Sequence, residues 1–165
     1  MSMINDGLFS SNTGKWNTPR ELLESLYTVF CLDLDPCSDS KKNPNVKARF
    51  HYTEEDNGLN KPWFGVVYVN PPYGRKISQW VHKAATCGAE TVVCLLPART
   101  DTRWWQDHVP SASFVVFVRG RLRFGTAANS APFPSALVVF GKINLNQKWL
   151  LSSMGWAIEQ GNSHA

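Results

Sequence analysis

The stretch Gly65-Val66-Val67-Tyr68-Val69-Asn70-Pro71-Pro72-Tyr73 decides the fold of this 165-residue chain. Its first part, Val66 to Val69, is a short apolar run of β-branched and aromatic residues, typical of a strand buried on both faces. The run stops at two prolines, which lack the backbone N–H needed to extend a sheet ladder. The sequence therefore predicts a buried strand followed by a stiff loop. Because ligands bind at the carboxyl ends of strands in open α/β sheets, this loop is a candidate ligand site.

The residues of the loop suit a site that holds an amino group. The side-chain oxygen of Asn70 and the backbone carbonyl of Pro71 are two acceptors in a rigid frame. Two acceptors that converge on an exocyclic amine would engage both of its N–H groups and raise the electron density on its nitrogen. Tyr73 offers an aromatic face on which a planar base can stack. The loop therefore favours an enzyme that transfers a group to the amine of a flipped base.

A helix is predicted directly after Thr18. Thr18 can cap this helix, Pro19 fits its first position, and Glu21 can close a capping box. An apolar stripe at helical spacing follows, formed by Leu22, Leu23, Leu26, Val29 and Phe30. A second stripe begins at Ile77 and predicts another helix, which Gly88 ends.

Three further apolar runs predict strands, at residues 91–96, 113–118 and 135–140. Residues 31–35 alternate apolar and acidic residues before Pro36 and predict a short strand with an acid at its carboxyl end, and residues 48–53 form either a short strand or an irregular segment. The strand before Asn70, the helix after it and the strand at 91–96 make a βαβ unit with parallel pairing. The last strand is expected to run antiparallel to its neighbour. The fold class is therefore α/β, a mostly parallel sheet flanked by helices. At least one of Trp104 and Trp105 is expected in the core, and Trp149 to Leu151 can pack down near the end.

Composition sets the broad class. Hydrophobic residues make up 43% of the chain, enough for the core of one domain. We expect a single domain over 1–165, with loose ends at 1–14 and 161–165. No apolar run reaches the ~18 residues of a membrane span, and the N-terminus lacks the features of a signal peptide, so a cytoplasmic protein without membrane contact is expected. The net charge of +4 leans toward a polyanionic partner.

The cysteines and histidines favour neither a disulfide nor a metal site. Cys31 and Cys94 lie in apolar runs and are expected to be reduced, buried residues, and no Cys-x-x-Cys spacing occurs. The four histidines are scattered, so no metal is expected.

Basic residues follow two of the predicted strands. Arg119, Arg121 and Arg123 alternate with apolar residues, and a strand or hairpin there would place them on one face as a phosphate track. An exposed basic edge strand is the alternative. Arg99 and Arg103 follow the strand at 91–96 and could reach phosphate near the Asn70 loop. The partner that these arginines favour is DNA.

The loop resembles a known motif. Asn70-Pro71-Pro72-Tyr73 is similar to the Asn/Asp-Pro-Pro-Tyr motif of amino-methyltransferases that use S-adenosylmethionine. Over residues 14–141 the chain resembles the compact, phage-type DNA N6-adenine methyltransferases (Dam-like). The resemblance rests on further motifs in this order: Trp16-Asn17-Thr18-Pro19, Leu32-Asp33-Leu34-Asp35-Pro36-Cys37, Leu95-Leu96-Pro97-Ala98-Arg99-Thr100-Asp101-Thr102, Gly120-Arg121-Leu122-Arg123-Phe124 and Ala131-Pro132-Phe133-Pro134-Ser135.

This resemblance implies a shortened Rossmann-like methyltransferase sheet. It also implies site-specific transfer of a methyl group from S-adenosylmethionine to adenine N6 of a flipped base in duplex DNA, and in a phage the protection of DNA against restriction. The implied catalytic residues are Asn70, Pro71, Pro72 and Tyr73. The implied cofactor-binding residues are Trp16, Thr18, Pro19, Asp35 and Pro36, with Asp56 as a weaker candidate.

The sequence leaves two kinds of alternative open. RNA-adenine and protein-glutamine methyltransferases carry the same four-residue motif. The chain also lacks the usual Gly-rich cofactor motif, and its region 38–62 is short for a methyltransferase core. A DNA-binding module with a decayed cofactor site is therefore the second alternative.

Overall fold

A computed structural model describes residues 16–161 of the chain. Of the loose ends expected at 1–14 and 161–165, all but residue 161 lie outside the described residues. One seven-stranded sheet has the strand order β2-β1-β3-β4-β6-β5-β7. Its strands are β1 (Leu34–Asp35), β2 (Phe50–His51), β3 (Val66–Val69), β4 (Thr91–Pro97), β5 (Phe114–Val118), β6 (Ser135–Gly141) and β7 (Gly155–Glu159).

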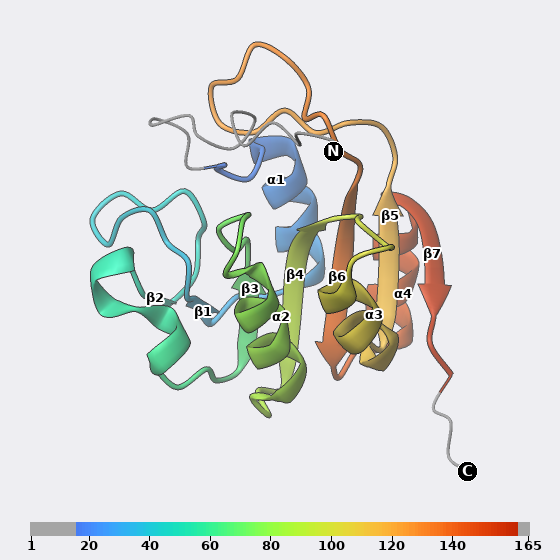
Figure 1. The fold of residues 1–165 in the computed structure, drawn as a ribbon, viewed down its shortest axis with the longest axis horizontal. Coiled ribbons are helices and arrows are strands. Elements are labelled where there is room, and N and C mark those ends of the chain that lie inside the picture. Colours follow the sequence, from blue (N-terminus) through green and yellow to red (C-terminus); the bar gives the residue numbers. More distant parts are fainter. Residues whose placement is uncertain (1–15, 162–165) are drawn as a thin grey trace, which may run out of the picture.

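Helices cover both faces of the sheet (Figure 1). One face carries α1 (Arg20–Val29) and α4 (Leu145–Ser152), and the other carries α2 (Ile77–Thr86) and α3 (Arg103–His108). Short 3₁₀ turns are η2 (Glu54–Asp56), η3 (Gly58–Asn60) and η4 (Val109–Ser111). The sheet divides the core into two apolar clusters, and all seven residues of β4 are buried between them. This explains why β4 reads as an unbroken apolar run.

The expected βαβ unit is confirmed. β3 pairs in parallel with β4, from Val66↔Thr91 to Val69↔Cys94, and α2 connects the two strands. β1 lies on the other side of β3, also in parallel, with Leu34 opposite Val67. The carboxyl ends of β1, β3 and β4 therefore meet at one edge of the sheet, at the top of Figure 1.

The prediction of a mostly parallel sheet is not quite matched. Three strand pairs are parallel and three are antiparallel. β6 runs antiparallel to its neighbour, as expected, but it lies between β4 and β5 and so makes two antiparallel pairs. β7, which the sequence did not predict, adds the third by pairing with β5.

Other expectations need correction. Thr18 does not cap α1, whose N-cap is Pro19 without a side-chain hydrogen bond, because the Thr18 hydroxyl is used elsewhere. The segment 119–124 forms no strand or hairpin. Cys31 is exposed, because it lies in the turn between α1 and β1, whereas Cys94 is buried as expected. Trp149 is exposed although Leu151 packs into the core.

Candidate active site

The side chain of Asn70, directly after β3, is fixed in one orientation. Its amide nitrogen donates to the backbone oxygen of Trp16 at 2.6 Å and to Oγ1 of Thr18 at 3.2 Å. Both amide hydrogens are therefore used. The other end, Oδ1, is buried and accepts no hydrogen bond from the residues that the structure describes. A buried acceptor without a donor costs about 1–3 kcal/mol, so its presence calls for an incoming donor.

Thr18 connects Asn70 to the core. Its hydroxyl lies 2.7 Å from the phenol oxygen of Tyr68, and both residues are buried. Because Thr18 Oγ1 accepts a hydrogen bond from Asn70, its own hydrogen is available to Tyr68. Burial raises the pKa of the Tyr68 phenol well above its ordinary value. Tyr68 therefore stays neutral and serves as a fixed anchor for Thr18. Sequence reasoning assigned Tyr68 only to the strand.

The segment around Trp16 is also tied to the loop after β1. Asn17 Nδ2 donates to Asp39 at 3.3 Å, and Asn45 Nδ2 donates to the backbone oxygen of Thr18 at 3.1 Å. The structure thus brings Trp16 and Thr18 beside Asn70, while Pro19 follows Thr18 as the N-cap of α1. Asn17 was quoted in the Trp16-Asn17-Thr18-Pro19 motif but given no role, and Asn45 was not singled out from the sequence.

Asp35, at the carboxyl end of β1, is a buried acid beside Pro36. One oxygen, Oδ1, accepts a hydrogen bond from the backbone N–H of Cys37 at 3.0 Å. Burial is the main reason that the pKa of Asp35 rises to about 7. Its other oxygen takes no hydrogen bond from the described residues, which leaves an acceptor suited to a ligand's hydroxyl or amino group. Pro36 packs closely on Gly58, where an added Cβ would lie 2.3 Å from the Pro36 oxygen.

Asp56 is engaged in its own turn, η2. Its carboxylate accepts hydrogen bonds from the backbone and hydroxyl of Thr53 and pairs with Lys41 at 2.8 Å. The hydrogen bond from Lys41 is the main reason that the pKa of Asp56 falls to about 2. The carboxylate of Asp56 therefore already stabilises the η2 turn. A cofactor that bound to Asp56 would have to share this carboxylate with Thr53 and Lys41.

Tyr73 lies in an aromatic cluster with Trp16, Phe124 and Phe133. Its ring centroid is 6.3 Å from Trp16, 6.2 Å from Phe124 and 5.5 Å from Phe133. Its hydroxyl donates to the backbone oxygen of Leu95 at 3.3 Å. The cluster joins the Asn-Pro-Pro-Tyr loop, the segment before α1 and the loop between β5 and β6. The Tyr73 ring is therefore half-buried and enclosed on several sides.

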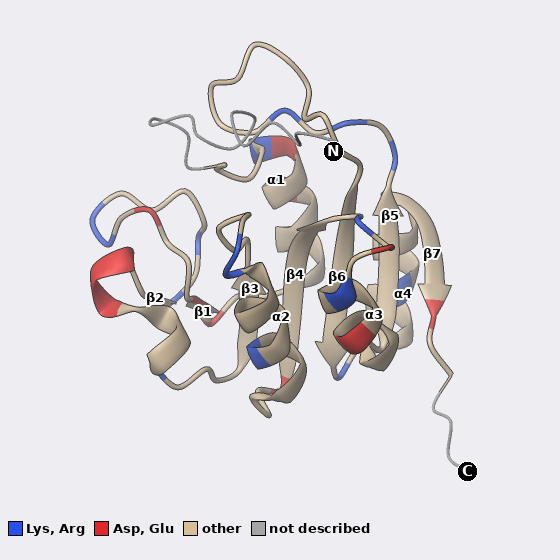
Figure 2. Cartoon of the chain, in the orientation of Figure 1, with Lys and Arg blue, Asp and Glu red and all other residues tan. Residues whose placement is uncertain are grey.

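The predicted DNA-binding arginines fall into two groups. Arg99 is exposed in the loop after β4, and Arg119, Arg121 and Arg123 are exposed in the loop after β5; Figure 2 draws basic residues in blue in both loops. The Arg99 guanidinium lies 5.9 Å from the centre of the Phe133 ring, and Arg121 reaches the backbone oxygen of Ala131 at 3.5 Å. Arg103 instead lies in α3, where it pairs with Asp107 at 3.5 Å.

Two basic residues at this edge were missed. Arg75 and Lys76 directly follow the Asn-Pro-Pro-Tyr loop and are exposed. They lie between β3 and α2, and because β3 and β4 are parallel, this loop is at the same end of the sheet as the loop that holds Arg99. Their position next to the motif was the signal that could have found them.

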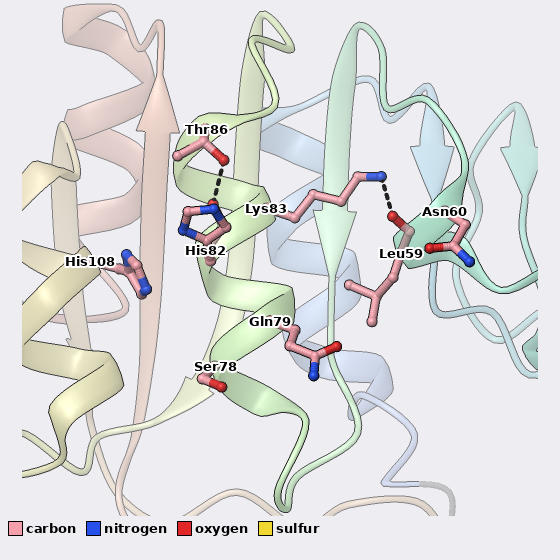
Figure 3. A pocket seen from close by; sticks show the side chains of 8 residues that line it. All are labelled: Leu59, Asn60, Ser78, Gln79, His82, Lys83, Thr86 and His108. Carbon is pink, nitrogen blue, oxygen red and sulfur yellow. Dashed lines mark hydrogen bonds between the residues drawn. The ribbon is translucent and has the colours of Figure 1, made fainter.

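A surface hollow of about 540 Å³ lies elsewhere, between η3, α2 and α3 (Figure 3). Its walls include Gln79, His82 and His108, and Lys83 crosses it to donate to the backbone oxygen of Leu59 at 2.7 Å. None of the residues predicted for the site lines this hollow.

Residues 16–161 hold no group of three or more His, Cys, Asp or Glu side chains placed to bind a metal ion. Within the same range, no helix has the length and apolar character to span a membrane.

Comparison with known proteins identifies the family. The family model described as DNA N-6-adenine-methyltransferase (Dam) matches residues 8–149. A search of curated proteins found no match. The family match includes the Asn-Pro-Pro-Tyr loop and each segment that the structure gathers around Asn70. The chain belongs to the family of DNA N-6-adenine-methyltransferases (Dam).

Proposed function

We propose that this chain transfers the methyl group of S-adenosylmethionine to N6 of an adenine flipped out of duplex DNA. Membership of the Dam family implies DNA adenine methyltransferase activity. Beyond that activity, we propose the cofactor, the flipped base and the roles of individual residues. Protection of phage DNA against restriction is the biological role that we propose with it.

The observation that carries the proposal is the unpartnered oxygen of Asn70. With its amide nitrogen held by Trp16 and Thr18, Asn70 presents Oδ1 as a fixed acceptor. The backbone oxygen of Pro71 also receives no hydrogen bond from the described residues. An adenine amine has two N–H donors, which match these two acceptors. Both hydrogen bonds would increase the electron density on N6 before attack.

The residues present fit the cofactor. Asp35 supplies a buried carboxylate at the carboxyl end of β1, next to the segment that holds Asn70. It would accept hydrogen bonds from a hydroxyl or amino group, while Trp16 and Pro36 would border the pocket. When bound, S-adenosylmethionine would supply a methyl group to the N6 lone pair, with the N–C bond forming as the C–S bond breaks and the sulfur leaving as a thioether. The methylated amine would then release one proton to solvent, and Asn70 would keep the amine oriented during that loss. This reaction requires no covalent bond to the enzyme and therefore no nucleophilic cysteine.

Tyr73 would receive the base. Its ring now contacts Phe124 and Phe133. A base that stacks on Tyr73 must take the place of a neighbouring ring, which requires the loop between β5 and β6 to move. Residues 125–130 of that loop are all exposed, but Phe124 and Phe133 are buried, so the movement must break the core contacts of the displaced ring.

Duplex DNA would lie across the basic edge of the sheet. Arg99, Arg123, Arg75 and Lys76 all occur in loops at the carboxyl ends of strands. Phosphate contacts from these side chains would position the duplex above Asn70. Sequence recognition would fall to the loop at 120–134 or to the segment 38–62.

Asn70→Ala tests the role of Asn70. The variant should bind S-adenosylmethionine with parental affinity in calorimetry but turn over at least about 100-fold more slowly, the typical loss when one preorganised hydrogen-bonding group is removed. Parental turnover would contradict the mechanism. No heat with S-adenosylmethionine, in the parent and with or without DNA, would support a decayed cofactor site. Methyl transfer to RNA or peptide in preference to duplex DNA would support the other methyltransferase classes.

A further inference from the structure

We infer that two copies of this chain associate through β7, pairing their edge strands antiparallel about Ala157 to form one continuous sheet. This inference is independent of the proposed function. It begins from an uneven distribution of apolar side chains. Of the six large hydrophobic residues that remain exposed among the described residues, four lie on α4 or β7, namely Leu145, Trp149, Trp156 and Ile158. The other two, Phe50 and Phe64, pack against each other at 5.5 Å.

Among residues 16–161, β7 is an unprotected edge strand. It is the last strand of the sheet that these residues form and pairs on one side only, with β5. Natural edge strands are usually very short, or carry lysine, proline or a covering segment that blocks pairing. β2, at the opposite edge, has only two residues. β7 has five residues, and its one charged residue, Glu159, is at the end and is already paired with Lys148.

The backbone of β7 is arranged to accept another strand. Arg119 donates to the Met154 oxygen at 3.0 Å, and Gln160 donates to the Ser113 oxygen at 3.3 Å. Both bonds lie in the β5–β7 register, which also places Phe117 opposite Trp156. Hydrogen-bonded pairs alternate along an antiparallel ladder. The even-numbered residues of β7 therefore bond to β5, and the odd-numbered ones direct their N–H and C=O groups outward.

Those outward groups belong to Gly155, Ala157 and Glu159, and they are self-complementary. A two-fold axis at Ala157 pairs this residue with itself and pairs Gly155 with the Glu159 of the second copy. All five residues of β7 then pair, and each outward N–H meets a C=O. No two like charges face each other, because each Glu159 lies opposite a glycine.

The same register matches the exposed side chains. Trp156 comes to lie opposite Ile158 of the second copy, at a non-hydrogen-bonded position where cross-strand side chains are closest. Trp156 stacks on Phe117 at 5.6 Å on its inner side yet remains 70% exposed. An aromatic residue and a β-branched residue in this position are a favourable cross-strand pair.

α4 adds a second apolar surface on the other face of the sheet. Its Lys148 side faces β7, because Lys148 pairs with Glu159. Leu145 lies three residues earlier, on the same side of the helix, and is 81% exposed. The two-fold axis would bring the two α4 helices to the same face, so that Leu145 and the neighbouring Trp149 become covered. A second copy thus satisfies both the backbone and the apolar side chains of this edge.

Sedimentation of the full chain tests the inference. At tens of micromolar, the parent should have twice the 18.5 kDa mass of the chain. Ala157→Pro removes an outward N–H from each copy and no bond to β5, and proline is tolerated at such edge positions. Loss of these two hydrogen bonds should weaken the dimer at least about 30-fold. Trp156→Lys, which places charge at the centre of the contact, should also give a monomer.

The matched control is Phe64→Lys, an exposed aromatic residue away from β7, which should stay dimeric. Circular dichroism and melting temperature establish that each variant is folded. A monomeric parent, or a dimer that survives both Ala157→Pro and Trp156→Lys, would overturn the inference. If Ala157→Pro alone fails to fold, the result with Trp156→Lys decides the question.

Discussion

Oγ1 of Thr18 lies 3.2 Å from the amide nitrogen of Asn70 and 2.7 Å from the phenol oxygen of Tyr68. Together with the backbone oxygen of Trp16, which can only accept, this buried contact holds the amide nitrogen of Asn70 and leaves Oδ1 without a partner among the described residues. If the amide turned over, its nitrogen would replace Oδ1 and could not accept a hydrogen bond from an amine. Thr18 is therefore a positioning residue for Asn70, in addition to the cofactor role proposed for it.

Thr18→Val keeps the shape of the side chain but removes this hydrogen bond. We expect kcat to fall about tenfold, equivalent to one hydrogen bond of ~1.4 kcal/mol, with little change in the Kd for S-adenosylmethionine. Thr18→Ser, which restores the hydroxyl, should recover most of the activity. An effect of Thr18→Val on cofactor Kd alone would show that Thr18 acts on the cofactor and does not orient Asn70.

The contributions of the Tyr73 ring and of its hydroxyl can be measured separately with two variants. Tyr73→Phe keeps the stacking surface and loses only the hydrogen bond to Leu95, so turnover should stay within about threefold of the parent. Tyr73→Ala should lower kcat/KM for DNA about 10- to 100-fold, because base–aromatic stacking contributes about 1–3 kcal/mol. Equal losses in the two variants, measured in one methyl-transfer assay, would argue against stacking.

The raised pKa of Asp35 predicts that the free energy of unfolding depends on pH. Burial raises its pKa from 3.8 to about 7, so between these values the folded state binds more protons than the unfolded chain. The stabilisation by protonated Asp35 is complete below the unfolded pKa and is lost as pH rises through about 7. The loss reaches about 4 kcal/mol above pH 7.

Asp35→Asn removes this titration. Denaturant unfolding at pH 5 and at pH 8 should show a larger decline in the parent than in the variant. Asp101→Asn, at an exposed position, is the control and should decline like the parent. An identical decline in parent and Asp35→Asn would rule out a raised pKa for Asp35.

Arg123 tests the proposed DNA surface. If Arg123 contacts a phosphate, Arg123→Gln should weaken binding to all duplexes alike and reduce the salt slope of log K by about 0.9. Lys142→Gln is the matched control, since exposed Lys142 bonds through its backbone to Glu90, just before β4 and at the other end of the sheet. Equal salt slopes for the two variants would contradict the assignment.

Local patterns made part of this structure predictable. The apolar run before Asn70 and the prolines after it identify β3 and its loop because their effects depend on adjacent residues. The stripe from Leu22 to Val29 identifies α1 for the same reason. The role of Thr18 was not predictable, because its partners Tyr68 and Asn70 are 50 and 52 residues away.

The C-terminal region was unpredictable for a different reason. Gly155–Glu159 is a short edge strand with exposed Trp156, so it lacks the buried apolar pattern of an inner strand. The aromatic cluster was equally hidden, because Phe124 and Phe133 meet Trp16 only through the fold.

The central claim is methyl transfer to adenine N6 in duplex DNA. The most direct measurement incubates the purified chain with unmethylated duplex DNA and labelled S-adenosylmethionine, and then separates the nucleosides. We predict label in N6-methyldeoxyadenosine, with little or none when Asn70→Ala replaces the parent. Folded protein that leaves the DNA unlabelled, or that labels another nucleoside, would contradict the claim.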